Sequence, residues 1–163
     1  MKQYLGVELI SAEPCSQDQY AKTKTFKNLS KLSGGVGREG YKVVYEDGYT
    51  SWSPKDVFEK AYRGIDNLTF GLAIEALKLG KLIARTGWNG SGMFICKQVP
   101  SIIGLEVIPK MQSLPQAAKD NLVKREQPIS YENQMLIVNS RGRADSWVPS
   151  SSDVFAEDWY IVE

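Results

Sequence analysis

The segment from Thr69 to Gly90 constrains the fold of this chain most strongly, because it specifies a helix, a strand and a tight loop in succession. Thr69 is a favourable N-cap residue, and apolar side chains follow it at helical spacing. Gly80 ends the helix, and Lys81 to Arg85 has the apolar run of a strand. The apolar face of this short amphipathic helix is formed by Phe70, Ala73, Ile74 and Leu77.

A Trp-Asn pair, Trp88 and Asn89, lies between Gly87 and Gly90 after this strand. The two glycines predict a tight loop. Two interpretations fit the residues alone. In one, Trp88 packs on the helix as ordinary core and Asn89 adopts a left-handed turn conformation. In the other, the loop presents both side chains to a ligand.

The 163-residue chain has a net charge of +1, from 20 basic and 19 acidic residues. Nucleic-acid-binding domains usually carry a marked basic excess, so we expect no DNA or RNA polymer as a partner. The sequence shows neither the ~18 consecutive apolar residues of a membrane span nor a signal-peptide pattern at its start. These features predict a cytoplasmic protein without a membrane partner, in which Cys15 and Cys96 are reduced thiols.

Histidine is absent from the sequence. Its absence excludes Ser-His and Cys-His nucleophile pairs, histidine-containing zinc sites and imidazole bases, and two isolated cysteines are too few for a structural zinc site. Adjacent carboxylates occur at Glu46-Asp47 and Glu157-Asp158, but neighbouring acids on surface turns are more often solvated or capping groups. We therefore expect a protein that is not an enzyme, with no catalytic residues, no metal and no cofactor.

The predicted elements divide the chain into two small domains, residues 1–65 and 66–163. In the first, strands are expected at 4–10 and 41–45, a turn at 46–48, and a helix from Pro54 to Ala61. In the second, short turns between consecutive strands favour antiparallel pairing. Its predicted strands are 81–85, 93–97, 134–138 and 146–148, with helices at 115–124 and 150–156 and a hairpin turn at 139–142. The predicted fold class is α+β, with small antiparallel sheets and short packed helices.

Three serines, Ser150, Ser151 and Ser152, precede Asp153 near the end of the chain. Their hydroxyls and the first amides of a helical turn would offer donors to ribose or phosphate oxygens, and a plain N-cap is the alternative. Two roles also fit Asp153. It accepts hydrogen bonds from ribose hydroxyls, or it caps the short helix.

These two segments carry a family resemblance. Thr69 to Asn89 resembles the opening motif of the Thoeris anti-defence two family of phage proteins, a TFG-x-ALE-x-LK-x-GK-like helix followed by an AR-x-GWNG-like turn. Trp147 to Trp159, WVPSSSDVFAEDW, is similar to the closing motif of that family. The resemblance covers residues 68–163, so Met1 to Tyr62 is an added module that looks like a small domain of other phage proteins.

The resemblance implies sequestration rather than catalysis. Members of this family bind glycocyclic ADP-ribose signals made by bacterial TIR-domain enzymes, in pockets between the subunits of a homotetramer, in the cytoplasm of the infected bacterial host. Some members also hold cyclic dinucleotides at separate sites, which is a further expectation for this chain. A protein that sequesters such a signal without cleaving it, called a sponge, needs an aromatic side chain on which adenine stacks. It also needs amide groups that bond to the edge of the adenine ring, and hydrogen-bond donors for ribose and pyrophosphate. The expected ligand-binding residues are Phe70, Arg85, Trp88, Asn89, Ser150, Ser152 and Asp153.

The alternative function is that of a phage adaptor or structural protein without a small-molecule ligand. The N-terminal module then binds a protein partner, and the C-terminal sheet oligomerises. Exposed tryptophan and tyrosine are common at protein interfaces, so Trp52, Tyr49 and Tyr62 serve this interpretation.

Overall fold

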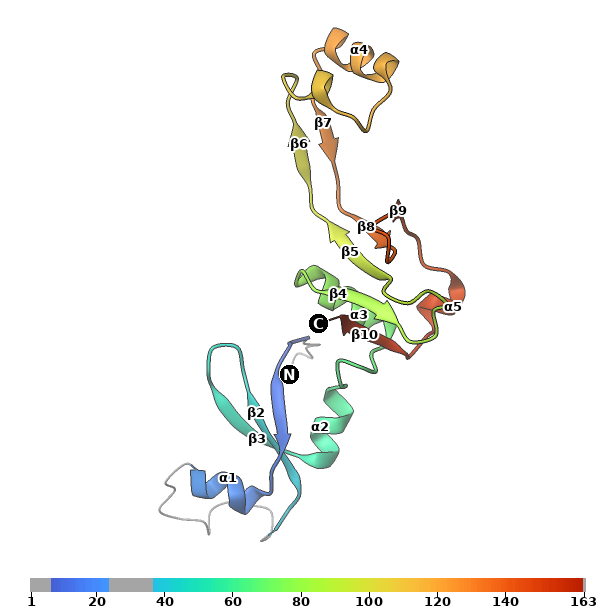
Figure 1. The fold of residues 1–163 in the computed structure, drawn as a ribbon. Helices are drawn as coiled ribbons and strands as arrows, with labels where there is room; N and C mark the ends of the chain where they lie inside the picture. The colour runs from blue at the N-terminus through green and yellow to red at the C-terminus, as the bar shows by residue number, and fades with distance from the viewer. Residues whose placement is uncertain (1–6, 24–36, 163) are drawn as a thin grey trace, which may run out of the picture. The chain divides into compact units, whose positions relative to one another are not determined.

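The structure is a computed structural model that describes residues 7–23 and 37–162. Its residues group into two compact units that divide between Leu68 and Thr69, and each unit is described by itself. Both units combine short helices with small antiparallel sheets (Figure 1). The predicted α+β class is therefore confirmed.

The N-terminal unit contains a three-stranded antiparallel sheet of order β1-β2-β3. Its strands are β1 (Ser11–Pro14), β2 (Gly40–Val44) and β3 (Thr50–Pro54), with helices α1 (Gln17–Thr23) and α2 (Lys55–Ala61). Gly48, at a φ of 81°, completes the predicted turn between β2 and β3. On α2, Phe58 stacks between Tyr41 and Tyr62, which fixes the helix on the sheet.

The first predicted strand is wrong in its position. Residues 7–10 have no regular structure, residues 4–6 lie outside the described residues, and β1 begins at Ser11. The physical reason is the short partner strand, because β2 pairs Ser11 with Val44 and Pro14 with Tyr41 and ends there. The apolar side chains of Val7 and Leu9, which suggested a strand, are 48% and 42% exposed.

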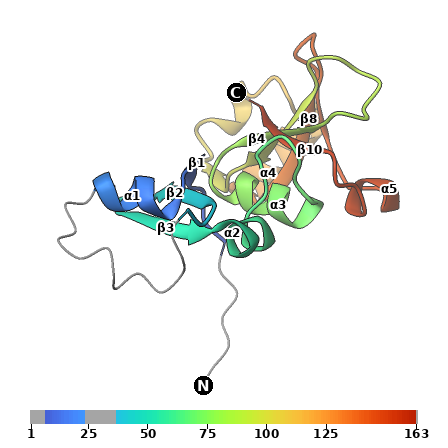
Figure 2. The same ribbon diagram turned by 90° about the horizontal axis from the view of Figure 1, so that it is seen from below.

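The C-terminal unit is built on a five-stranded antiparallel sheet of order β10-β4-β5-β8-β9. Helix α3 (Phe70–Lys78) begins and ends as predicted, since the Thr69 hydroxyl accepts from the Leu72 amide and Gly80 takes a φ of 80°. It packs beside β4 and β10, as Figure 2 shows from below. The strands are β4 (Leu82–Arg85), β5 (Phe94–Gln98), β8 (Gln134–Val138), β9 (Ala144–Ser146) and β10 (Trp159–Val162).

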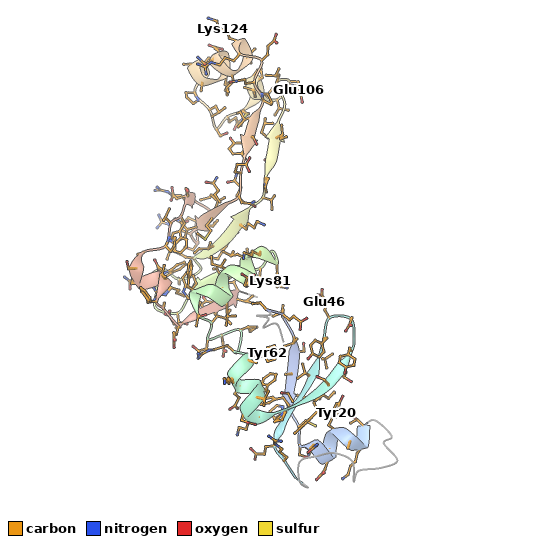
Figure 3. The ribbon with its side chains drawn as sticks, turned by 180° about the vertical axis from the view of Figure 1, so that it is seen from behind. Tyr20, Glu46, Tyr62, Lys81, Glu106 and Lys124 are labelled. Atoms are coloured by element: carbon orange, nitrogen blue, oxygen red, sulfur yellow. The ribbon has the colours of Figure 1, made fainter. Side chains whose placement is uncertain are left out.

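An arm extends the β5 and β8 strands of this unit. It consists of the paired strands β6 (Ser101–Ile103) and β7 (Ile129–Tyr131), the 3₁₀ turn η2 (Ile108–Lys110) and helix α4 (Gln116–Lys124). Ile108 is fully buried in the tip, where η2 contacts α4. Figure 3 shows Glu106 and Lys124 at this tip, away from Lys81 at the start of β4. The predicted helix at 115–124 is thus confirmed as α4.

The last part of the chain follows the prediction with one shift. The turn at 139–142 is confirmed, with Gly142 at a φ of 79° and the Asn139 amide bonded to the Arg143 carbonyl. Strand β9 ends at Ser146 rather than at Val148, because the chain leaves the sheet after Trp147 to enter α5 (Ser151–Val154). Cys15 and Cys96 are both free thiols. Within the described residues, none of the helices is long and apolar enough to cross a membrane.

Candidate ligand-binding site

Four aromatic rings pack together in the C-terminal unit. They come from α3, from the loop after β4, and from the first and last residues of the closing motif, Trp147 to Trp159. We call Phe70, Trp88, Trp147 and Trp159 the aromatic cluster. Trp159 is fully buried at its centre, with ring centroids 5.4 Å from Phe70, 5.5 Å from Trp88 and 6.0 Å from Trp147. Trp88 meets both other tryptophans at steep interplanar angles of 63° and 78° and is itself half-buried. Edge-to-face contacts of this kind fix the orientation of an aromatic ring.

Arg85, the last residue of β4, lies between two carboxylates. Its Nη1 donates to Asp153 Oδ1 and its Nε to Asp158 Oδ1, both at 2.8 Å. The guanidinium carbon also lies 5.8 Å from the centre of the Trp159 ring. The Arg85 side chain is only 16% exposed, and the hydrogen bond to Asp158 raises its pKa. Arg85 therefore ties the closing segment to the strand that precedes the Trp88 loop.

Asp153 is a buried carboxylate at the start of α5. Its Oδ2 accepts from the backbone amide of Ser150 at 2.9 Å and from the Ser150 hydroxyl at 2.6 Å, while the Ser150 hydroxyl accepts from the Asp153 amide. This reciprocal arrangement is a capping box. Its Oδ1 accepts from Trp88 Nε1 at 3.3 Å as well as from Arg85. Burial raises the pKa of Asp153, but the hydrogen bonds from Ser150, Arg85 and Trp88 outweigh burial and lower it to about 2.

The Trp88 loop is fixed to the sheet through its backbone. The Gly87 amide donates to Asp158 Oδ2 at 2.8 Å, and the Trp88 amide donates to the Arg85 carbonyl at 3.4 Å. Asn89 is exposed, and its side chain has no hydrogen-bond partner among the described residues. Its backbone is not left-handed, because Glu126 is the one non-glycine residue of the described chain with a positive φ.

The structure brings the predicted site residues into one neighbourhood of the C-terminal unit. Arg85, Trp88, Ser150 and Asp153 form a continuous hydrogen-bond network, and Phe70 joins it through the rings of the aromatic cluster. The Ser152 hydroxyl lies 2.8 Å from that of Ser150. Asn89 follows Trp88 in the chain without bonding to the network.

Three residues of this neighbourhood were not among the predicted site residues: Trp147, Trp159 and Asp158. All three belong to the closing motif, WVPSSSDVFAEDW, so the signal was present in the sequence. Asp158 was interpreted, together with Glu157, as a solvated or capping group on a surface turn. Its partnership with Arg85, 73 positions earlier, depends on the pairing of β10 with β4 and has no local signature.

The chemistry of this site is that of a rigid, polar-lined aromatic surface. The hydrogen bond from Arg85 lowers the pKa of Asp158, so both carboxylates are ionised at neutral pH and are already bonded to donors. Among residues 7–23 and 37–162, Cys, Asp and Glu do not gather into any group of three that could hold a metal ion. An open hollow of about 430 Å³ lies beside Cys15, Tyr41 and Lys55 of the N-terminal unit, and none of the predicted site residues lines it.

Comparison with known proteins places this site within a described domain. A family model described as Tad2-like, the Thoeris anti-defense 2-like domain, matches residues 68–162. The chain is also similar to Thoeris anti-defense 2 of Bacillus phage SP01, with 33% identity over 98 residues. That match covers 58% of this chain and 94% of the phage protein. The family-model match spans the aromatic cluster and the Arg85 network.

Proposed function

Because the chain belongs to the Thoeris anti-defense 2-like family, we propose that it is a phage anti-defence sponge that binds and holds glycocyclic ADP-ribose without cleaving it. Withdrawing this signal prevents activation of the Thoeris defence effector. The name of the phage SP01 protein supports the anti-Thoeris role. The choice of glycocyclic ADP-ribose as the bound signal rests on the family resemblance of the two motifs.

The observation that carries the proposal is the placement of Trp88 and Asn89. The Trp88 ring is held by Trp147, Trp159 and Asp153 and is only partly buried, and we infer that it offers a fixed aromatic face to a base. Stacking of a base on such a ring contributes roughly 1–3 kcal/mol. The neighbouring Asn89 amide has both donors and an acceptor available for the edge of adenine. Pre-organisation of the ring reduces the entropy lost on binding.

The remaining predicted site residues divide into two roles. Arg85 and Ser150 both donate to Asp153, so we assign these three residues to holding the Trp88 ring in place. Phe70 supports the same cluster from α3. Ser152 is exposed beside the capping box and is suited to donate to a ribose or phosphate oxygen.

Retention without cleavage agrees with the state of the carboxylates. A general acid must be protonated near the working pH, whereas the pKa of Asp153 is about 2 and that of Asp158 is also lowered. The sequence contains no histidine to replace them. We therefore expect the bound signal to be released unchanged.

Assembly is part of the same proposal. The family resemblance implies a homotetramer with pockets between subunits, and it extends to cyclic dinucleotides as a second class of ligand. A pocket shared by two subunits would place additional donors opposite Trp88 and would help to account for tight retention.

A capture-and-release experiment tests the proposed function. The full chain is incubated with glycocyclic ADP-ribose, freed of unbound ligand and denatured, and the released material is analysed by mass spectrometry. We expect the released nucleotide to be intact. The wild type and Asn133→Ala should bind it equally well, and Asn89→Ala should bind it about tenfold more weakly. Asn133 is a matched control because it is also an exposed loop asparagine, in the arm. A cleaved product would indicate an enzyme, and no capture would favour the adaptor function.

A further inference from the structure

We infer that Asp158 is a positioning residue, which fixes the backbone of the Trp88 loop and thereby sets the affinity of the site without touching the ligand. The consequence for affinity rests on the proposed function. The positioning itself does not, because it concerns contacts that exist in the free protein.

The carboxylate of Asp158 bonds to the loop and to the strand that precedes it. One oxygen accepts from Arg85 Nε and the other from the Gly87 amide, each at 2.8 Å. The backbone of Asp158 adds a third bond, since its carbonyl accepts from the Thr86 amide at 3.1 Å. Asp158 directly precedes β10, whose first residue, Trp159, pairs with Arg85. The loop therefore leaves the sheet in one defined direction.

Gly87 provides an independent sign that this contact is specific. A Cβ atom at Gly87 would lie 2.8 Å from Asp158 Oδ2, closer than such atoms approach in folded proteins. Any larger residue would push the carboxylate off the amide that it accepts from. At Gly90 the nearest atom to a Cβ is the flexible end of the Met93 side chain, which is able to move away. The close approach of a carboxylate thus accounts for glycine at position 87.

The two carboxylates that bond to Arg85 act on different parts of the Trp88 loop. Asp153 accepts from the indole N–H and orients the ring, whereas Asp158 holds the backbone two residues before Asn89. Arg85 bonds to both and keeps their separation fixed. Asp158 is 35% exposed in its side chain, so its removal leaves the buried core in place. Loss of Asp158 should therefore loosen the loop more than it weakens the fold.

Amide hydrogen exchange in the ligand-free full chain tests the positioning role. In Asp158→Ala we expect the Gly87 amide to exchange at least tenfold faster than in the wild type, while the core amide of Ile83 in β4 changes less than twofold. Glu157→Ala is the matched control, because Glu157 is exposed and carries the same charge one position earlier. It should leave both rates within twofold. Equal acceleration at Gly87 and Ile83, or none at Gly87, would overturn the inference.

Calorimetry with glycocyclic ADP-ribose, carried out on those variants that fold, tests the consequence for affinity. Asp158→Ala should bind at least tenfold more weakly than the wild type, and Glu157→Ala should bind within twofold. Gly87→Ala should also bind more weakly, because its Cβ atom displaces the Asp158 carboxylate. If Asp158→Ala does not fold, the affinity of Gly87→Ala tests the inference instead. Native affinity in folded Asp158→Ala or Gly87→Ala contradicts the inference. A wild type that binds no signal contradicts the proposed function instead, and the exchange rates still decide the role of Asp158.

Discussion

Trp88 has the contacts of a core residue, and in the proposed function it also provides the surface on which the base stacks. It packs edge-to-face against Trp147 and Trp159, as a core residue does, and it donates a hydrogen bond to Asp153. Its side chain is nevertheless only partly buried, and its neighbour Asn89 is exposed. In the proposed function, these contacts hold the ring in the orientation that stacking requires.

We expect Trp88→Ala to weaken binding of glycocyclic ADP-ribose about 100-fold, because it removes the stacking face. The variant should fold but lose about 2 kcal/mol of stability with its ring contacts. Trp88→Phe should keep an aromatic ring for stacking while losing the hydrogen bond to Asp153. Its affinity should therefore lie between those of the wild type and Trp88→Ala. Calorimetry and urea denaturation measure both quantities. A folded Trp88→Ala with near-native affinity would remove Trp88 from the ligand site.

At the scale of the element, α5 depends on the ionised carboxylate of Asp153. The helix has four residues, too few to be stable by itself, and the capping box with Ser150 supplies its first turn with partners. The pKa of Asp153 is about 2 in the folded chain, against 3.8 in an unfolded one. The unfolded state therefore binds more protons as the pH falls. The resulting stabilisation, about 2 kcal/mol, is complete at neutral pH and is lost from about pH 5 down to pH 2.

The pH dependence of the free energy of unfolding should reveal the titration of the Asp153 carboxylate. Between pH 6 and pH 3 the wild type should lose about 1 kcal/mol more stability than Asp153→Asn, which has no proton to bind there. Urea denaturation followed by tryptophan fluorescence is suitable, because three of the four tryptophans belong to the aromatic cluster. Parallel stability curves for the two proteins would show that Asp153 is not the titrating group.

The sequence predicted best those elements whose signals are local. Helix α3 has an N-cap, an apolar face and a terminating glycine within twelve residues, and β4 and β8 are compact apolar runs. Strand β10, by contrast, was not predicted. Its place at the edge of the sheet depends on pairing with β4, which lies more than 70 positions earlier. Strands β6 and β7 of the arm likewise depend on each other across 25 intervening residues.

The site was predicted in the same uneven way. Motif resemblance points to both of its segments, so the sequence alone predicts Trp88, Asn89 and Asp153 as site residues. Local patterns did not reveal that Arg85 is shared by two carboxylates, because that depends on β10 and α5 meeting the end of β4. This explains why Arg85 was predicted to contact the ligand, whereas we now assign it to holding Trp88.

At the scale of the whole molecule, the candidate site belongs entirely to one unit. Among residues 69–162, the ring contacts of the aromatic cluster and the ion pairs of Arg85 join residues between Phe70 and Trp159. An alignment of 98 residues covers 94% of the phage SP01 relative and 58% of this chain, and the family model begins at residue 68. The N-terminal unit is therefore an addition to the family domain.

A chain limited to residues 66–163 should consequently retain the binding activity. We expect its affinity for glycocyclic ADP-ribose to lie within twofold of that of the full chain, because no residue assigned to the site is removed. Leu68, which is 6% exposed, is kept in the shortened chain so that its buried surface is not lost. Calorimetry on both proteins measures the affinity, and thermal denaturation of the shortened chain checks that it folds. A folded shortened chain that binds more than tenfold more weakly would show that the N-terminal unit contributes to the site.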